Sequence, residues 1–129
     1  MKISFDFDDT LTHVEVQKCA RELIKRGHEI YILTARFSDE YDVDGQVIGW
    51  SKDWNDDLKE LALDLGIPRD RWLFAGIGTK SRLAKIYKIE LHLDDSGDDV
   101  RDIQTVCKSI IFNKYDWQNS LERFIKLIT

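Results

Sequence analysis

The sequence alternates between short apolar runs and longer amphipathic stretches, and this alternation restricts the possible folds more than any other feature. Each short run has the length and residue types of a strand, whereas each longer stretch has apolar residues at helical spacing. Strands that alternate with helices are typical of βα units, in which consecutive strands run parallel. We predict strands at 3–7, 29–33, 72–75, 89–93 and 109–112, and helices at 12–26, 54–65, 79–87, 100–103 and 117–128.

These units predict an α/β fold, a three-layer, Rossmann-like open sheet of about five parallel strands. Crossovers between parallel strands are right-handed, so helices should cover both faces of the sheet. The unbroken apolar run at 30–33 fits a strand that is covered on both faces. At 129 residues the chain fits one domain, residues 1–129, with a single core.

Bulk composition narrows the classes of protein. The chain carries 24 acidic and 19 basic side chains, a formal net charge of −5, and lacks the basic character expected of a general nucleic-acid binder. Its apolar runs are too short to span a bilayer, and carboxylates follow the N-terminus too closely for a signal peptide. The two cysteines, Cys19 and Cys107, lie far apart within apolar patterns and suggest buried free thiols. We expect a cytoplasmic protein with no membrane partner.

Polar side chains follow three of the predicted strands. Asp6 and Asp8 come at the end of the first strand, Thr34 follows the second, and Asp94 with Asp95 follows the fourth. In an open parallel sheet, ligands bind beyond the carboxyl ends of the strands, which meet at one edge. We therefore expect these side chains to converge at that edge.

The aspartates at this edge need compensation. Asp6 and Asp8 are two residues apart, so on an extended strand both carboxylates face the same way and repel each other. A hard cation compensates such charges, and few protein ligands with several waters are typical of Mg²⁺. Paired aspartates at strand ends also cap helices or form turns, but two pairs after different apolar strands favour a functional site. We predict a Mg²⁺ site with ligands from Asp6, Asp8, Asp94 and Asp95.

The motifs at these strand ends resemble, in type and in order, those of the haloacid dehalogenase-like (HAD) superfamily of phosphohydrolases, over residues 2 to about 112. The first motif, an apolar strand followed by D-x-D-x-T, is ISFDFDDTLT at 3–12. The second, an apolar strand ending in Ser or Thr, is IYILT at 30–34. The third is a lysine ahead of the fourth strand, Lys80, and the fourth is the carboxylate pair in LHLDD at 91–95.

The resemblance implies a Mg²⁺-dependent phosphatase, a phosphoric monoester hydrolase. Asp6 would attack phosphorus to form an aspartyl-phosphate, and Asp8 would protonate the leaving oxygen and then activate the water that releases phosphate. A second positioned carboxylate suits both steps, because it serves in turn as acid and as base. Mg²⁺, Lys80 and the Thr34 hydroxyl would meet the charge on the phosphoryl oxygens.

Three further assignments rest on weaker signals. Arg36 is a candidate for bidentate binding of a substrate phosphate, with an exposed arginine at the start of a loop as the equal alternative. Thr10, the last residue of the D-x-D-x-T motif, is assigned to substrate binding together with Arg36. Lys85 competes with Lys80 for the third motif, and Lys80 is preferred because it starts a helix after the loop Gly76-Ile77-Gly78-Thr79.

No large cap domain is expected over the site. Many members of the superfamily carry one after the first motif or between the second and third, but here a helical pattern starts directly after Thr12 and only the loop 37–50 is available. An open site suits a large substrate, such as a nucleic-acid terminus or a phosphoprotein, or completion by another subunit. We expect a phosphorylated substrate, small or macromolecular, with a nucleotide or a nucleic-acid terminus as candidates. The segments 34–36 and 94–96 are loosely similar to polynucleotide kinase phosphatase domains and 5′-nucleotidases, although the net charge counts against nucleic acid.

Two alternatives come from other functional classes. A receiver-like phosphoacceptor module also uses aspartates, a hydroxyl residue and a lysine around Mg²⁺, but it keeps its phosphorylated aspartate on the middle strand, and the segment 72–76 contains none. A catalytically silent binding module of the same fold is the other alternative, and the presence of both Asp6 and Asp8 counts against it.

Overall fold

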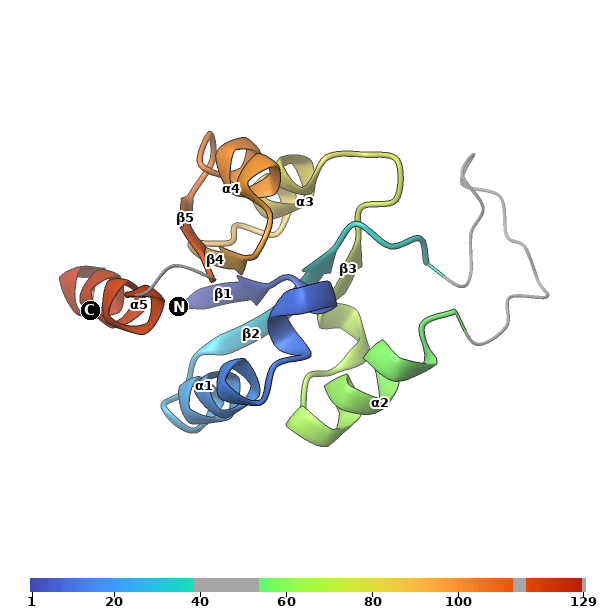
Figure 1. The fold of residues 1–129 in the computed structure, drawn as a ribbon, viewed down its shortest axis with the longest axis horizontal. Helices are drawn as coiled ribbons and strands as arrows, with labels where there is room; N and C mark the ends of the chain where they lie inside the picture. Colours follow the sequence, from blue (N-terminus) through green and yellow to red (C-terminus); the bar gives the residue numbers. More distant parts are fainter. Residues whose placement is uncertain (39–53, 113–115, 129) are drawn as a thin grey trace.

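The computed structural model describes residues 1–38, 54–112 and 116–128. Its strands form one parallel sheet in the order β3-β2-β1-β4-β5, so the first strand of the chain is the middle strand of the sheet (Figure 1). The strands are β1 (Lys2–Phe5), β2 (Glu29–Thr34), β3 (Trp72–Phe74), β4 (Leu91–Asp94) and β5 (Lys108–Ile111).

Helices cover both faces of this sheet (Figure 1). They are α1 (Val14–Lys25), α2 (Asp56–Leu65), α3 (Lys80–Ile86), α4 (Gly97–Ile103) and α5 (Trp117–Ile128). The buried residues of α1, α2 and α5 form one apolar cluster with the sheet, and Ala84 of α3 and Ile103 of α4 belong to a second cluster. The three-layer, Rossmann-like α/β fold predicted from the sequence is confirmed.

The alternation of side chains along β2 explains why both faces need helices. Ile30 and Ile32 belong to the cluster under α1, α2 and α5, whereas Tyr31 and Leu33 belong to the cluster under α3 and α4. Successive side chains of a strand point to opposite faces, so an unbroken apolar run requires cover on both sides. This packing fixes the register of β2 beside β1, and with it the place where both strands end.

Among the element boundaries that differ from the sequence prediction, two affect the site. The first strand ends at Phe5 rather than at residue 7, because the backbone becomes helical at Phe7 and then takes a positive φ of 60° at Asp9. Helix α4 begins at Gly97 rather than at residue 100. The Ser96 side chain caps it by accepting the backbone N–H of Asp99 at 3.3 Å.

The strand order reverses at β1 and β4. From β1 the chain builds β2 and β3 on one side and then crosses to β4 on the other side. Ligands bind at such a reversal of strand order in open α/β sheets. The order also differs from the 2-1-3-4-5 order of flavodoxin-like and receiver sheets, in which β3 lies beside β1.

Within the described ranges the structure has no large cap domain, in agreement with the prediction from the sequence. Most of the loop 37–50 falls within 39–53, which lies outside the described residues. Among the helices that are described, none has the length and apolar character needed to cross a membrane.

Candidate active site

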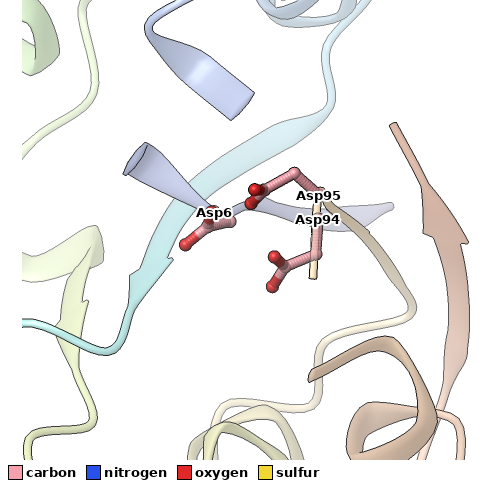
Figure 2. A group of neighbouring side chains, drawn as sticks. All are labelled: Asp6, Asp94 and Asp95. Atoms are coloured by element: carbon pink, nitrogen blue, oxygen red, sulfur yellow. The ribbon is translucent and has the colours of Figure 1, made fainter. Parts of the chain in front are cut away.

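Three carboxylates gather at the carboxyl ends of β1 and β4. Asp6 directly follows β1, Asp94 is the last residue of β4, and Asp95 comes next. One oxygen from each lies within 4.8 Å of the others, and Figure 2 shows the three side chains grouped at the ends of the two strands. The backbone N–H of Asp6 donates to the carbonyl of Leu93 at 2.9 Å, which extends the pairing of the strands into the site. Asp6, Asp94 and Asp95 therefore converge as the sequence suggested.

Lys80 links these carboxylates to a fourth one. Its Nζ lies 2.9 Å from Asp6 Oδ1, 2.8 Å from Asp94 Oδ2 and 2.9 Å from Asp99 Oδ2. The side chain, on the first residue of α3, is only 4% exposed, because it projects toward these carboxylates. Burial alone would lower the pKa of Lys80, but Asp6 and Asp94 outweigh it and raise this pKa. Lys80 therefore stays charged, whereas Lys85 of the same helix is exposed.

The Asp94 carboxylate is also held by a histidine of its own strand. The fully buried ring of His92 places Nε2 2.8 Å from Asp94 Oδ2, and its Nδ1 lies 2.7 Å from the Ser4 hydroxyl. Ser4 and His92 are partners in the register of β1 and β4, so all three side chains point to the same face of the sheet. Burial lowers the pKa of His92, which favours a neutral imidazole.

Thr10 lies behind the carboxylates. Its hydroxyl is fully buried, 3.2 Å from Asp6 Oδ2 and 3.3 Å from Asp95 Oδ1. A hydroxyl has one proton, so it donates to one of these oxygens at a time. In this structure Thr10 orients the two aspartates, and its assignment to substrate binding remains a prediction.

The cluster has more negative charge than it can balance alone. Asp6, Asp94, Asp95 and Asp99 surround a single lysine. Burial and the charge of Asp94 raise the pKa of Asp6 to about 8, even though Lys80 opposes the shift. For Asp94, burial is outweighed by His92 and Lys80, which keep its pKa below the usual range. An all-carboxylate donor set with excess negative charge is the type that a hard divalent cation binds.

Asp8 does not join this cluster. Its carboxylate is 54% exposed and is held by Arg36, with Nε to Oδ2 at 2.9 Å and Nη2 to Oδ1 at 2.7 Å. The expectation that Asp6 and Asp8 point together is wrong, because the chain leaves the extended conformation at Phe7, between these two residues. The structure therefore does not bring the Asp8 side chain to the other predicted Mg²⁺ ligands.

Arg36 binds a second carboxylate in the same way. Its guanidinium donates to Asp57 Oδ1 at 2.7 Å and to Asp57 Oδ2 at 3.0 Å, and it lies over the Phe7 ring at 4.8 Å. Hydrogen bonds to both aspartates raise the pKa of Arg36, and the same bonds lower the pKa of Asp57. The Arg36 guanidinium thus joins the end of β2 to the first turn of α2 and to Asp8.

Thr34 ends β2 beside this arginine. Its side chain is almost fully buried, and its hydroxyl accepts the backbone N–H of Arg36 at 3.2 Å. That bond turns the chain out of the strand and directs Arg36 toward Asp8. The role of Thr34 in binding phosphoryl oxygens remains a prediction.

Sequence reasoning missed three residues that hold the site. Asp99 contacts Lys80, Asp57 contacts Arg36, and His92 contacts Asp94. Two of them carry a local signal, because each is an aspartate in the first turn of a helix, where a carboxylate is favoured. The position of His92 within a buried strand, two residues before Asp94, is the signal for the third.

Comparison with known proteins supports the fold and nothing finer. No family model and no curated protein matches the chain. The crystal structure of an uncharacterized protein from Corynebacterium glutamicum superposes with a TM-score of 0.61 and 17% sequence identity, and the match covers 98% of this chain and 93% of that one. A likeness at this level of identity indicates a shared α/β fold.

Proposed function

We propose that this protein is a Mg²⁺-dependent phosphate-monoester hydrolase that acts through an aspartyl-phosphate on Asp6. The observation that carries the proposal is the contact of Lys80 with both Asp6 and Asp94. Three residues that are far apart in the sequence meet at the strand-order reversal, in the order that the HAD resemblance implies. The all-oxygen donor set of Asp6, Asp94 and Asp95 fits Mg²⁺, which would supply positive charge to the phosphoryl oxygens when bound.

The chain's own residues divide the chemistry into two displacements. In the first, an oxygen of Asp6 bonds to phosphorus while the bond to the leaving oxygen breaks, and that oxygen takes a proton from Asp8. In the second, water bonds to phosphorus as the bond to Asp6 breaks, and the proton of the water returns to Asp8. Lys80 stays charged throughout and stabilises the negative oxygens beside Asp6.

The contact between Asp8 and Arg36 gives a role to the arginine. Asp8 is exposed and ion-paired in this structure, so it must release Arg36 before it can reach a leaving oxygen. A substrate phosphate would accept the same two N–H groups of Arg36 and free Asp8. This exchange favours a substrate with a second phosphate or a phosphodiester near the scissile group, such as a nucleotide or a nucleic-acid terminus.

The test is hydrolysis of para-nitrophenyl phosphate by the full chain with and without Mg²⁺. We expect turnover that EDTA suppresses, no turnover above background for Asp6→Asn, and a loss of about 10²- to 10⁴-fold for Asp8→Asn. Asp98→Asn is the matched control, because this aspartate is 88% exposed and pairs only at the surface with Arg101. Its activity should equal that of the wild type.

The proposal fails if the wild type shows no metal-dependent turnover on this ester or on a panel of nucleotides, sugar phosphates and 3′-phosphorylated oligonucleotides. Mg²⁺ binding without any turnover would point to the silent binding module instead. Stable phosphorylation of an aspartate without release of phosphate would point to a phosphoacceptor, which the strand order of the sheet disfavours.

A further inference from the structure

His92 is the one fully buried histidine among the residues that the structure describes, and its ring contacts Asp94 directly. We propose that His92, supported by Ser4, is a positioning residue that fixes the Asp94 carboxylate so that Oδ1 is free to bind a divalent cation. The inference rests on the proposed function, because it concerns the metal site of that reaction. It concerns a residue to which the resemblance assigns no role.

The hydrogen bonds of the ring define one tautomer. The Asp94 carboxylate only accepts, so Nε2 of His92 must carry the proton and donate it across 2.8 Å. Nδ1 of the neutral ring then accepts from the Ser4 hydroxyl across 2.7 Å. Each of these buried groups has a partner in this arrangement, and the paired register of Ser4 and His92 holds the ring at this distance.

The same contacts separate the two oxygens of Asp94. Oδ2 accepts from both His92 Nε2 and Lys80 Nζ, which uses both of its lone pairs. Oδ1 accepts only the backbone N–H of Ser96, at 3.1 Å, among the contacts within the described residues. One lone pair of Oδ1 therefore remains available. Because His92 binds Oδ2, the available oxygen is Oδ1. A partner of this kind beyond the metal ligands fixes the orientation of a ligand and strengthens metal binding.

Ser109 supplies a matched control on the other side of the ring. It pairs with His92 in the register of β4 and β5, as Ser4 does in that of β1 and β4. Both serines are buried, but the Ser109 hydroxyl has no hydrogen-bond partner in the part of the chain that the structure describes. Ser4→Ala removes a hydroxyl that is hydrogen-bonded to the His92 ring, whereas Ser109→Ala removes a hydroxyl that makes no hydrogen bond to it.

The experiment measures the Kd for Mg²⁺ by calorimetry on the full chain and the His92 tautomer by nitrogen NMR without metal. The NMR spectrum of the wild type should show a protonated Nε2 and an unprotonated Nδ1. His92→Asn, whose amide is too short to reach Asp94, should weaken binding by about 10- to 100-fold. His92→Gln places an amide nitrogen near the position of Nε2 and should recover most of the affinity. Ser4→Ala should weaken binding less than His92→Asn, and Ser109→Ala should leave it unchanged.

The outcomes separate this inference from the proposed function. If the wild type binds Mg²⁺ and hydrolyses phosphate esters while His92→Asn and Ser4→Ala bind with equal affinity, the inference is overturned and the function stands. A ring protonated at Nδ1 would overturn it as well. If the wild type binds no Mg²⁺ and shows no turnover, the function itself fails. Should His92→Asn not fold, the pair Ser4→Ala and Ser109→Ala decides the question.

Discussion

Two positively charged side chains at the edge of the sheet are each bound by carboxylates, and they differ in burial. Lys80 is 4% exposed and contacts Asp6, Asp94 and Asp99, whereas Arg36 is 23% exposed and holds two aspartates that are both more than half exposed, Asp8 and Asp57. Buried ion pairs are screened little by water or salt, so removal of one partner leaves an uncompensated charge. Exposed pairs contribute little and exchange partners readily.

The difference separates a fixed part of the site from an exchangeable part. Lys80 and its carboxylates come from α3, α4 and the ends of β1 and β4, all of which are held by the core. Arg36 lies at the start of the loop after β2 and holds Asp8 through contacts that a substrate anion can replace. The predictions below test this contrast, from the largest expected effect to the smallest.

The largest effect should come from replacing each of the two charged side chains, Lys80 and Arg36, in turn. Without metal, Lys80→Met should lower the free energy of unfolding by about 3–5 kcal/mol, because the buried carboxylates of Asp6 and Asp94 then lose the charge of Lys80. Arg36→Met should cost about 1 kcal/mol or less, because its partners are solvated. Urea unfolding in EDTA measures both. Lys85→Met, on the exposed face of the same helix as Lys80, serves as control and should change stability by under about 0.5 kcal/mol. Equal losses for Lys80 and Arg36 would remove the contrast.

The residues of the fixed part were accessible to sequence reasoning to a large extent. Asp6, Asp94 and Asp95 follow apolar strands, and parallel strands end at one edge, so their convergence follows from the order of the elements. Lys80 follows from its place at the start of a helix that faces the same edge. These inferences need only the periodicity of the sequence and the handedness of crossovers.

The exchangeable part was not accessible in the same way. The position of Asp8 depends on where the first strand ends, and the turn that starts at Phe7 and includes the positive φ of Asp9 has no reliable sequence signal. Asp57 meets Arg36 across 21 positions of sequence, and that contact depends on how α2 packs against the sheet. Local patterns predict elements and their order, whereas contacts between loops and helix termini depend on tertiary packing.

The second prediction concerns pH and the buried cluster. The pKa of Asp6 is about 8 in the folded state against 3.8 in the unfolded state, so the folded chain binds a proton that the unfolded chain has lost. This contribution to stability is fully present below pH 3.8 and is lost as pH rises through about 8. In EDTA, Asp6→Asn should therefore gain stability relative to the wild type as pH rises from 5 to 8, by roughly 4 kcal/mol.

Thermal unfolding of both proteins across this pH range measures the difference directly. Other titrating groups are common to wild type and variant, so the difference between the two curves isolates Asp6. Asp8→Asn is the control from the exposed cluster and should gain no such stability, because water already solvates its carboxylate. A difference that stays flat from pH 5 to pH 8 would contradict the raised pKa of Asp6.

The third prediction concerns metal. A cation that binds only the folded state stabilises it by RT ln(1 + [L]/Kd), which is about 1.4 kcal/mol when free Mg²⁺ is about ten times Kd. Thermal unfolding with and without Mg²⁺ should show this gain for the wild type and for Asp57→Asn, whose carboxylate belongs to the Arg36 cluster. Asp94→Asn should lose the gain. A gain that persists in Asp94→Asn would place the cation elsewhere.

The smallest effect should be the sensitivity of the Arg36 cluster to salt. Asp57 is 61% exposed, so Asp57→Asn should cost about 0.5 kcal/mol at low ionic strength. The cost should vanish near 0.5 M NaCl, roughly the range in which screening shortens the reach of exposed charges to a few ångströms. Urea unfolding in EDTA at both salt concentrations measures it, with Lys80→Met as the reference. Because the partners of Lys80 are largely buried, the loss of stability caused by Lys80→Met should be nearly the same at both salt concentrations. If salt reduced this loss as much as it reduces that of Asp57→Asn, the Lys80 and Arg36 clusters would be equally open to solvent.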